Sequence, residues 1–252
     1  MTELLLLSNS TNHGATFLAH ALDAVQDWLG GRGSLLFVPF AKAAHDDYTA
    51  TVAEALEPLG VSVRGVHTAA DPVQAVREAE AVFVGGGNSF RLLQALHEMG
   101  LVEPLRERVR EGMPYMGSSA GTNMACPTLR TSNDMPIVQP PTFAALGLVP
   151  FQINPHYLDP ESASTHMGET RAERLAEFHE ENDVTVLGLR EAAWLSVRDE
   201  RATLGGKTGA RLFRRGAQAQ EIAPGADLSA LLGETPRFDQ PAGAPEGARP
   251  AS

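Results

Sequence analysis

The most reactive candidate in the sequence is Ser119, at the centre of the run Gly117-Ser118-Ser119-Ala120-Gly121. This run has the form G-x-S-x-G and lies between a short apolar segment and a segment expected to be helical, which is the context of a nucleophile elbow. Small neighbours let the chain turn sharply and expose the serine hydroxyl. The alternatives are an ordinary glycine-rich turn and a phosphate-binding turn, and the context favours a nucleophile.

A serine hydroxyl needs a base to take up its proton, and histidine is the side chain whose pKa lies nearest to neutral pH. Of the eight histidines, His156 is the strongest candidate. It follows Pro155 in the run Gln152-Ile153-Asn154-Pro155-His156-Tyr157, which we interpret as a rigid turn inside a long irregular stretch. A hydrogen-bonded loop histidine without a catalytic role is the alternative interpretation.

The histidine in turn needs a carboxylate to hold its tautomer, and two candidates are open. Asp134 is one, and it could equally belong to an Asx turn. Glu191 is the other, because it closely follows a predicted strand over 184–189 and ligands of open α/β sheets bind beyond the carboxyl ends of strands. A solvated loop carboxylate is its alternative. Both chain orders, Ser119-Asp134-His156 and Ser119-His156-Glu191, suit a triad.

An acyl-transfer reaction also needs N–H donors for the developing oxyanion. The elbow itself supplies the backbone N–H of Ala120. A second donor is expected from the loop Gly85-Gly86-Gly87-Asn88-Ser89-Phe90, with Gly86 and Gly87 as candidates. This loop could instead cradle a phosphate, but it lacks the Lys-Ser/Thr ending of a P-loop and the spacing G-x-G-x-x-G, which disfavours nucleotide binding.

The elements that must position these residues alternate as in an α/β protein with a parallel sheet. Short apolar runs predict strands over 4–7, 34–38, 61–66, 81–84, 114–116 and 184–189. Amphipathic stretches predict helices over 17–28, 48–56, 73–78, 89–99, 104–110, 122–126 and 168–180. Three further short strands, 194–197, 202–204 and 211–213, predict hairpins at one edge of the sheet. We therefore expect a doubly wound, mostly parallel sheet with helices on both faces.

One catalytic domain is expected over residues 1–234, because 252 residues with 43% apolar composition can bury one large core or two small ones. Residues 126–160 contain seven prolines and little periodicity. Long irregular stretches in compact domains are usually functional. From residue 235 onward the composition is Pro, Gly, Ala and charge, which predicts a disordered tail over 235–252.

Charge and composition exclude several classes of protein. A formal net charge of −11 makes nucleic acid an improbable partner, since a polyanion would be repelled. The single cysteine, Cys126, excludes a disulfide framework and a Cys-rich zinc site. The apolar run at 4–7 is too short for a signal sequence or a membrane span. We therefore expect a soluble, cytoplasmic protein with no membrane partner, and the sequence makes no prediction of its oligomeric state.

Five motifs, in the same order, resemble the peptidase E family, the α-aspartyl dipeptidases among the serine peptidases. They are Gly85 to Phe90, Gly117 to Gly121, Asn133 to Ile137, Ile153 to Tyr157 and Gly168 to Arg171. The resemblance runs from about residue 4 to residue 215. It implies an α/β fold like that of the class I glutamine amidotransferases, and cleavage of dipeptides with an N-terminal aspartate without a metal or cofactor. Ser118 departs from the pattern, because a bulkier residue is expected before the nucleophile.

The same resemblance implies the roles of individual residues. It places the nucleophile on Ser119, the histidine on His156 and the charge-relay acid on Asp134, with Glu191 as a rival for the acid role. If Asp134 completes the triad, Glu191 is free to bind the amino terminus of the substrate.

Specificity for aspartate demands a cation, because a buried substrate carboxylate is costly unless it is paired. Arg171 is the candidate, since a guanidinium can grip a carboxylate at two points. Its alternative is a surface charge on a helix. Asn88, in the loop after the predicted strand 81–84, is a further substrate-binding candidate.

Two other functions stay open. One is a cyanophycinase-like enzyme of the same superfamily, which would cut β-linked aspartyl-arginine. The other is a non-catalytic relative that keeps the fold and an anion pocket. A glutamine amidotransferase is disfavoured, because its thiol should stand at the elbow and Cys126 lies seven residues beyond Ser119.

Overall fold

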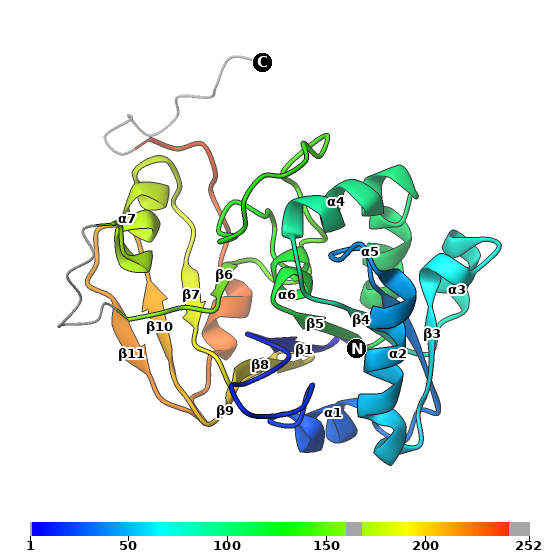
Figure 1. The fold of residues 1–252 in the computed structure, drawn as a ribbon. Coiled ribbons are helices and arrows are strands. Elements are labelled where there is room, and N and C mark those ends of the chain that lie inside the picture. The colour runs from blue at the N-terminus through cyan, green and yellow to red at the C-terminus, as the bar shows by residue number, and fades with distance from the viewer. Residues whose placement is uncertain (1, 160–167, 242–252) are drawn as a thin grey trace.

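The computed structural model describes residues 2–159 and 168–241 (Figure 1). In chain order the helices and strands are β1 (Glu3–Leu7), α1 (Leu22–Leu29), β2 (Ser34–Val38), α2 (His45–Leu56), β3 (Ser62–Gly65), α3 (Pro72–Glu78), β4 (Val82–Val84), α4 (Ser89–Glu98), α5 (Val102–Arg110), β5 (Tyr115–Ser118), α6 (Ala120–Ala125), β6 (Gln152–Pro155), α7 (Arg171–Glu181), β7 (Val186–Leu189), β8 (Ala193–Arg198), β9 (Arg201–Gly206), β10 (Ala210–Phe213) and β11 (Gln220–Ile222). None of the helices in the described ranges is both long and apolar enough to cross a membrane.

The larger of two sheets has seven strands in the order β3-β2-β4-β5-β1-β8-β9. Its first five strands run parallel, and the hairpin of β8 and β9 adds two antiparallel strands beside β1. The predicted doubly wound α/β fold with an edge hairpin is confirmed. In such a sheet the loops that bind ligands leave the carboxyl ends of the parallel strands.

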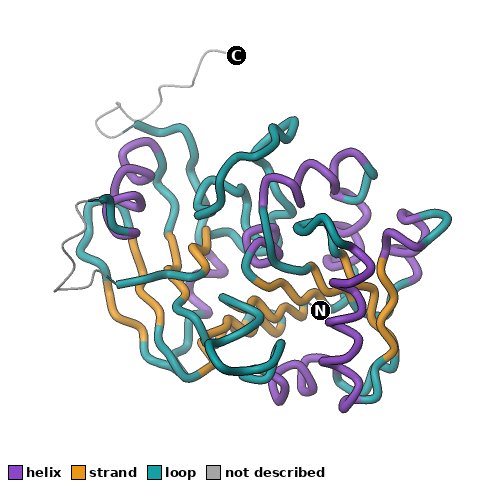
Figure 2. The backbone as a smooth tube through the Cα atoms, in the orientation of Figure 1, coloured by secondary structure: helices purple, strands orange, loops and turns teal. Residues whose placement is uncertain are grey.

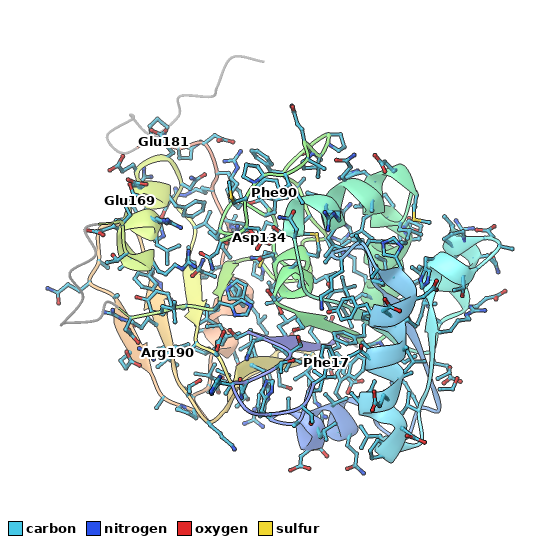
Figure 3. The ribbon with its side chains drawn as sticks, viewed as in Figure 1. Phe17, Phe90, Asp134, Glu169, Glu181 and Arg190 are labelled. Atoms are coloured by element: carbon cyan, nitrogen blue, oxygen red, sulfur yellow. The ribbon has the colours of Figure 1, made fainter. Side chains whose placement is uncertain are left out.

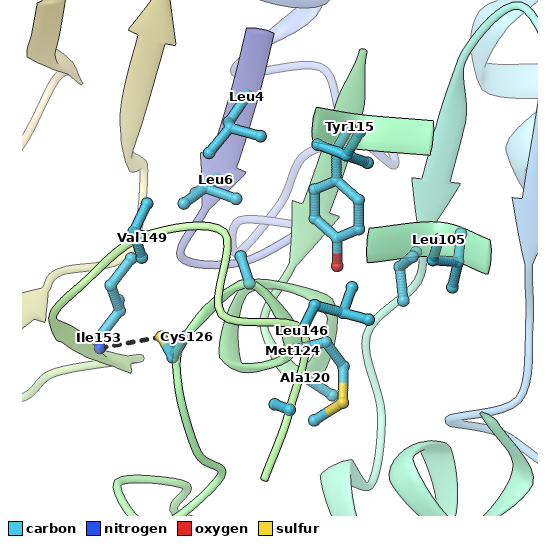
Figure 4. Close-up of a cluster of buried hydrophobic side chains, with 14 of the residues drawn as sticks. Leu4, Leu6, Leu105, Tyr115, Ala120, Met124, Cys126, Leu146, Val149 and Ile153 are labelled. Atoms are coloured by element: carbon cyan, nitrogen blue, oxygen red, sulfur yellow. Dashed lines mark hydrogen bonds between the residues drawn. The ribbon is translucent and has the colours of Figure 1, made fainter. Parts of the chain in front are cut away.

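Alternation along the strands explains why both faces of this sheet are covered by helices. Leu4 and Leu6 of β1 belong to one buried cluster, which also takes residues from α4, α5 and α6. Leu5 and Leu7 belong to a second cluster, packed against α1 and α2. Figure 4 shows Leu4, Leu6 and Tyr115 on the side of the sheet that faces α6. Strands with this pattern must be buried on both sides.

The smaller sheet has the strand order β11-β10-β7-β6 and was not expected from the sequence. The prediction placed residues 211–213 in hairpins at the edge of the main sheet, but β10 pairs with β7 instead. Residues 152–155, interpreted as part of a turn, form the strand β6, which runs parallel to β7. The loop between α6 and β6 is long and without regular structure, as predicted (Figure 2). Buried residues of both sheets share one core cluster.

The predicted disordered tail is wrong for its first residues. The backbone of Arg237 exchanges two hydrogen bonds with Asp183, of 2.8 and 3.1 Å. Asp239 forms an ion pair with Arg130 at 2.7 Å, and the Arg130 guanidinium lies over the Phe238 ring. The Phe238 ring and two ion pairs, Asp239 with Arg130 and Arg237 with Asp183, anchor a segment whose composition predicts disorder. Residues 242–252 of the predicted tail lie outside the described residues.

Candidate active site

Ser119 occupies the sharp turn between β5 and α6. Its backbone has φ 52° and ψ −108°, a region that residues with a side chain seldom adopt. Strained backbone of this kind concentrates at functional sites. Its N–H is bonded to the carbonyl of Leu7 at 3.1 Å, which fixes the turn to the end of β1.

The two glycines of G-x-S-x-G are required by close backbone contacts rather than by positive φ. A Cβ on Gly117 would lie 2.5 Å from the carbonyl oxygen of Gly121. A Cβ on Gly121 would lie 2.0 Å from the carbonyl oxygen of Val84. Any side chain at either position would therefore push α6 away from the sheet and move Ser119.

His156 lies beside the nucleophile. Its Nε2 is 2.9 Å from the Ser119 Oγ, within reach for proton transfer. Like Ser119, His156 has a positive φ, of 52°. The residue stands immediately after β6, so two strained residues at the ends of two strands meet at one point.

Glu191 holds the other side of the imidazole, with its Oε1 2.8 Å from His156 Nδ1. The parallel pairing of β6 and β7 explains this contact. Pro155 lies opposite Leu189, so the residues that follow the two strands leave the sheet side by side. Glu191, His156 and Ser119 thus form a continuous hydrogen-bonded line, the geometry of a catalytic triad.

Asp134, the other candidate acid, has a different partner. Its Oδ2 accepts a 2.8 Å hydrogen bond from the backbone N–H of Ser89 at the start of α4, close to Phe90 (Figure 3). The neighbouring Asn133 side chain donates to the carbonyl of Pro155 at 2.7 Å. Asp134 therefore lies near the site but does not take the place beside His156 that the resemblance implied for it.

Ser8 is a buried residue of the site that the sequence analysis missed. Its Oγ accepts a hydrogen bond from the His156 N–H at 2.9 Å and donates one to the Leu189 carbonyl at 2.8 Å. One hydroxyl from the end of β1 therefore connects the segments that carry the histidine and Glu191. The available signal was a polar residue directly after the buried strand at 4–7.

The loop of residues 85–88 lies against the elbow, since a Cβ on Gly86 would be only 3.1 Å from that of Ser119. The Gly86 N–H is not available to a substrate, because it donates to the Tyr48 hydroxyl at 2.8 Å. Gly87 N–H has no acceptor among the residues described here. Of the two expected glycine donors, only Gly87 is therefore free, and Ala120 starts α6 with an N–H that its helix cannot satisfy.

Asn88 is engaged within the protein. Its Oδ1 accepts from the Arg91 N–H at 3.0 Å, capping α4, and its Nδ2 donates to the Met135 carbonyl at 2.8 Å. Each polar side-chain atom of Asn88 thus has one partner within the protein, and the expected role in substrate binding stays a prediction. Asn88 joins the loop beside the elbow to the loop that carries Asp134.

Arg171 begins α7 and is half-buried. Partial burial and the nearby Arg174 lower the pKa of its guanidinium, and the Asp134 carboxylate opposes this effect. No ion pair joins Arg171 to any carboxylate in the described part of the chain. The charges of Arg171 and Asp134 are therefore close enough to interact, although the two side chains form no ion pair.

Cys126 is a structural thiol. It is fully buried at the C-terminal end of α6, and its Sγ accepts a hydrogen bond from the Ile153 N–H. Burial raises the pKa of the thiol to about 12. A thiol of this kind does not compete with Ser119 as a nucleophile.

The chain is similar in sequence to known peptidases. Peptidase family S51 matches residues 4–205. Peptidase E from Streptomyces coelicolor is 64% identical over 94% of this chain and 97% of its own length. A Drosophila melanogaster protein named "Probable alpha-aspartyl dipeptidase" is 53% identical over 91% of this chain and 97% of its own length.

A solved structure supports the fold. The crystal structure of a peptidase from an acI-B1 actinobacterium superposes with a TM-score of 0.67 at 15% identity, covering 90% of this chain and 96% of the other. The family match spans the elbow, the histidine and the glutamate described above. The chain therefore belongs to peptidase family S51 and is a serine-type peptidase.

Proposed function

We propose that this chain is a dipeptidase that releases an N-terminal aspartate from Asp-Xaa through the triad Ser119, His156 and Glu191. One observation carries the proposal: Ser119, on a strained elbow, is 2.9 Å from His156, which is 2.8 Å from Glu191. The names of the S. coelicolor and D. melanogaster relatives support the choice of an aspartyl dipeptide as substrate.

In the first half of the reaction, His156 Nε2 takes the Ser119 proton as Oγ attacks the carbonyl carbon of the aspartyl residue. Glu191 accepts the Nδ1–H of His156 and stabilises the imidazolium that forms. The N–H groups of Ala120 and Gly87 bind the oxyanion. The imidazolium then protonates the leaving amine, and the aspartyl group stays on Ser119 as an ester.

In the second half, a water molecule takes the place of the leaving amine. His156 removes a proton from this water, which attacks the ester carbonyl through a second oxyanion. Collapse of that intermediate returns the proton to Ser119 and releases aspartate. Every step uses the same three side chains and the same two N–H donors.

Recognition of the N-terminal residue falls to Arg171 and Asp134. Because Glu191 is committed to His156, the remaining carboxylate, Asp134, binds the free α-ammonium group of the substrate. Arg171 pairs with the aspartate side chain. The two charged groups of the substrate are attached to neighbouring carbon atoms, which suits a site where the Asp134 carboxylate lies near a guanidinium that has no ion pair to the described residues. A longer peptide that presents no free amine there loses this contact.

Hydrolysis of Asp-Leu by Ser119→Ala tests the proposal. We expect kcat to fall by about 10⁴-fold or more, as for loss of a triad member, with an unchanged melting temperature. Ser118→Ala is the matched control, because this neighbouring hydroxyl is buried behind the elbow and takes no part in the reaction. Near-normal turnover by Ser119→Ala would contradict the mechanism, and turnover of β-Asp-Arg in place of Asp-Leu would contradict the substrate.

A further inference from the structure

Five consecutive N–H groups precede and open α4, and four of them are held by the protein. Gly85 donates to the Val38 carbonyl at 3.1 Å and Asn88 to the Ala41 carbonyl at 2.9 Å. Side chains hold two more: Gly86 donates to the Tyr48 hydroxyl and Ser89 to the Asp134 carboxylate, each at 2.8 Å. The remaining one, Gly87 N–H, faces no acceptor in the residues that the structure describes.

Tyr48 lies on α2 and is not a member of the proposed triad, but its hydroxyl contacts this loop. It is buried, and its ring packs edge-on against Phe37 at a centroid distance of 4.9 Å, while the Lys42 ammonium lies 4.0 Å from the ring centroid. Burial raises the pKa of the Tyr48 phenol to about 12, partly opposed by the hydrogen bond from Gly86. The hydroxyl is therefore uncharged at neutral pH. The contacts with Phe37 and Lys42 hold the ring in place.

We propose that Tyr48 is a positioning residue that aims the Gly87 N–H at the reacting carbonyl oxygen. The inference rests on the function proposed above, in which Gly87 is an oxyanion donor. Tyr48 itself touches neither substrate nor triad. It acts by fixing the peptide unit before the one that carries the Gly87 N–H, while the Ala41 carbonyl fixes the unit after it.

The glycines of the loop make such an external support necessary. A Cβ on Gly85 would lie 2.8 Å from the Tyr48 ring, and one on Gly87, where φ is +139°, would lie 2.4 Å from the Ala41 carbonyl oxygen. Tyr48 and Ala41 thus approach the loop so closely that only glycine fits at positions 85 and 87. Glycine is also the residue with the most flexible backbone. Hydrogen bonds from neighbouring elements supply the orientation that the loop itself cannot.

Removal of the Tyr48 hydroxyl leaves a buried N–H on Gly86 without an acceptor, a costly state that rotation of the peptide unit relieves. Rotation carries the adjacent Gly87 N–H away from its target. An oxyanion donor acts only from its aligned position, and a misplacement of about 1 Å can cost about 10²-fold in rate. The binding of ground-state ligands does not use this donor and is left unchanged.

The experiment compares Tyr48→Phe with Tyr157→Phe, which removes a phenol hydroxyl that faces Arg211 instead of the loop. We expect Tyr48→Phe to lower kcat for Asp-Leu by about 10- to 10²-fold, with KM and the affinity for free aspartate within about twofold of wild type. A boronic acid carrying an aspartate-like side chain, which forms a tetrahedral adduct on the serine, should lose affinity by the same factor as kcat. Tyr157→Phe should change none of these values.

Three results would overturn the inference. They are an unchanged kcat in Tyr48→Phe, an equal loss of kcat and aspartate affinity, and a loss of kcat without a loss of boronate affinity. A Tyr48→Phe protein that melts well below Tyr157→Phe and loses aspartate binding would show a role in folding only, and would also count against it. Ser119→Ala, assayed alongside, separates the two proposals, because an active Ser119→Ala removes the proposed function itself.

Discussion

The His156 Nδ1 and the Glu191 Oε1 lie 2.8 Å apart although 35 residues separate them in the chain. The parallel register of β6 and β7 places them together, with Pro155 opposite Leu189. This contact places Glu191 beside His156, the base of the proposed triad, and leaves Asp134 for another role in the proposed mechanism.

Replacing Glu191 and replacing Asp134 by their amides should therefore have different kinetic effects. Glu191→Gln keeps an oxygen near His156 but no longer stabilises the imidazolium, so we expect kcat to fall by between about 10²- and about 10⁴-fold. We expect a loss nearer to about 10²-fold, because Glu191 is half-exposed and water can partly take over the stabilisation of the imidazolium. Steady-state kinetics with Asp-Leu measure the effect.

Asp134→Asn is the matched comparison. The side-chain oxygen of the new amide would still accept a hydrogen bond from the Ser89 N–H, so the loop that carries residue 134 stays in place. The negative charge that we propose binds the substrate amine is lost. We expect KM to rise by about 10-fold or more, with a smaller change in kcat. If Asp134→Asn instead abolished kcat and Glu191→Gln did not, Asp134 would be the triad acid and the present assignment would be wrong.

The sequence predicted the parts of the site that depend on neighbouring residues. The G-x-S-x-G elbow is local, and its strand, turn and helix follow from five residues. The choice between Asp134 and Glu191 is not local, because it depends on a register inside a second sheet whose strand β6 lay in a segment interpreted as a turn. The pairing of these two strands, which are distant in the sequence, brings Glu191 and not Asp134 into contact with His156.

Ser8 and Tyr48 were missed for a related reason. Each is an ordinary residue of its own segment, and each contributes through a single hydroxyl directed at a loop far away in the chain. Composition likewise misjudged residues 235–241, where Arg237 pairs with Asp183. Polar contacts between distant segments leave no periodic trace in a sequence.

Ser8→Ala should impair catalysis more than substrate binding. The substitution removes the acceptor of the His156 N–H, and a buried N–H without a partner costs about 1–3 kcal/mol. The loop that carries His156 can relieve this cost by moving the imidazole away from Ser119. We expect kcat to fall by about 10-fold, with KM nearly constant, in steady-state assays. Ser10→Ala, two residues further along the same loop, is the control, and equal effects of both variants would argue against a positioning role for Ser8.

Arg190→Gln should lower stability in a pH-dependent manner. Arg190 lies among β7, β10 and β11 (Figure 3), and it pairs with Asp159 at 2.7 Å and with Glu221. Hydrogen bonds from Arg190 are the main cause that lowers the pKa of both carboxyl groups. Groups with lowered pKa values stabilise the folded state above their ordinary pKa, and this stabilisation is lost as the pH falls through the lowered values.

Thermal unfolding of Arg190→Gln at several pH values checks this expectation. Above about pH 5 the carboxylates are ionised in both folded and unfolded chains, and we expect a melting temperature roughly 2–6 °C below wild type. The difference should shrink in acid, as the carboxyl groups of the wild type become protonated. A difference that stayed constant down to the acid limit would show that packing of the Arg190 side chain, and not its charge, supports the fold.

Arg171→Gln should remove the preference for aspartate that we propose for this enzyme. The guanidinium is half-buried and without an ion pair to the described residues, so a substrate carboxylate gains a partner that costs the protein no existing contact. Loss of one member of a desolvated charge pair costs about 2–5 kcal/mol. We expect kcat/KM for Asp-Leu to fall by about 10²-fold, while the slow turnover of Asn-Leu stays the same. Arg174→Gln, on the same helix but exposed and paired with Glu169 at 3.6 Å, should keep the preference, and a uniform loss on both substrates in Arg171→Gln would place the aspartate pocket elsewhere.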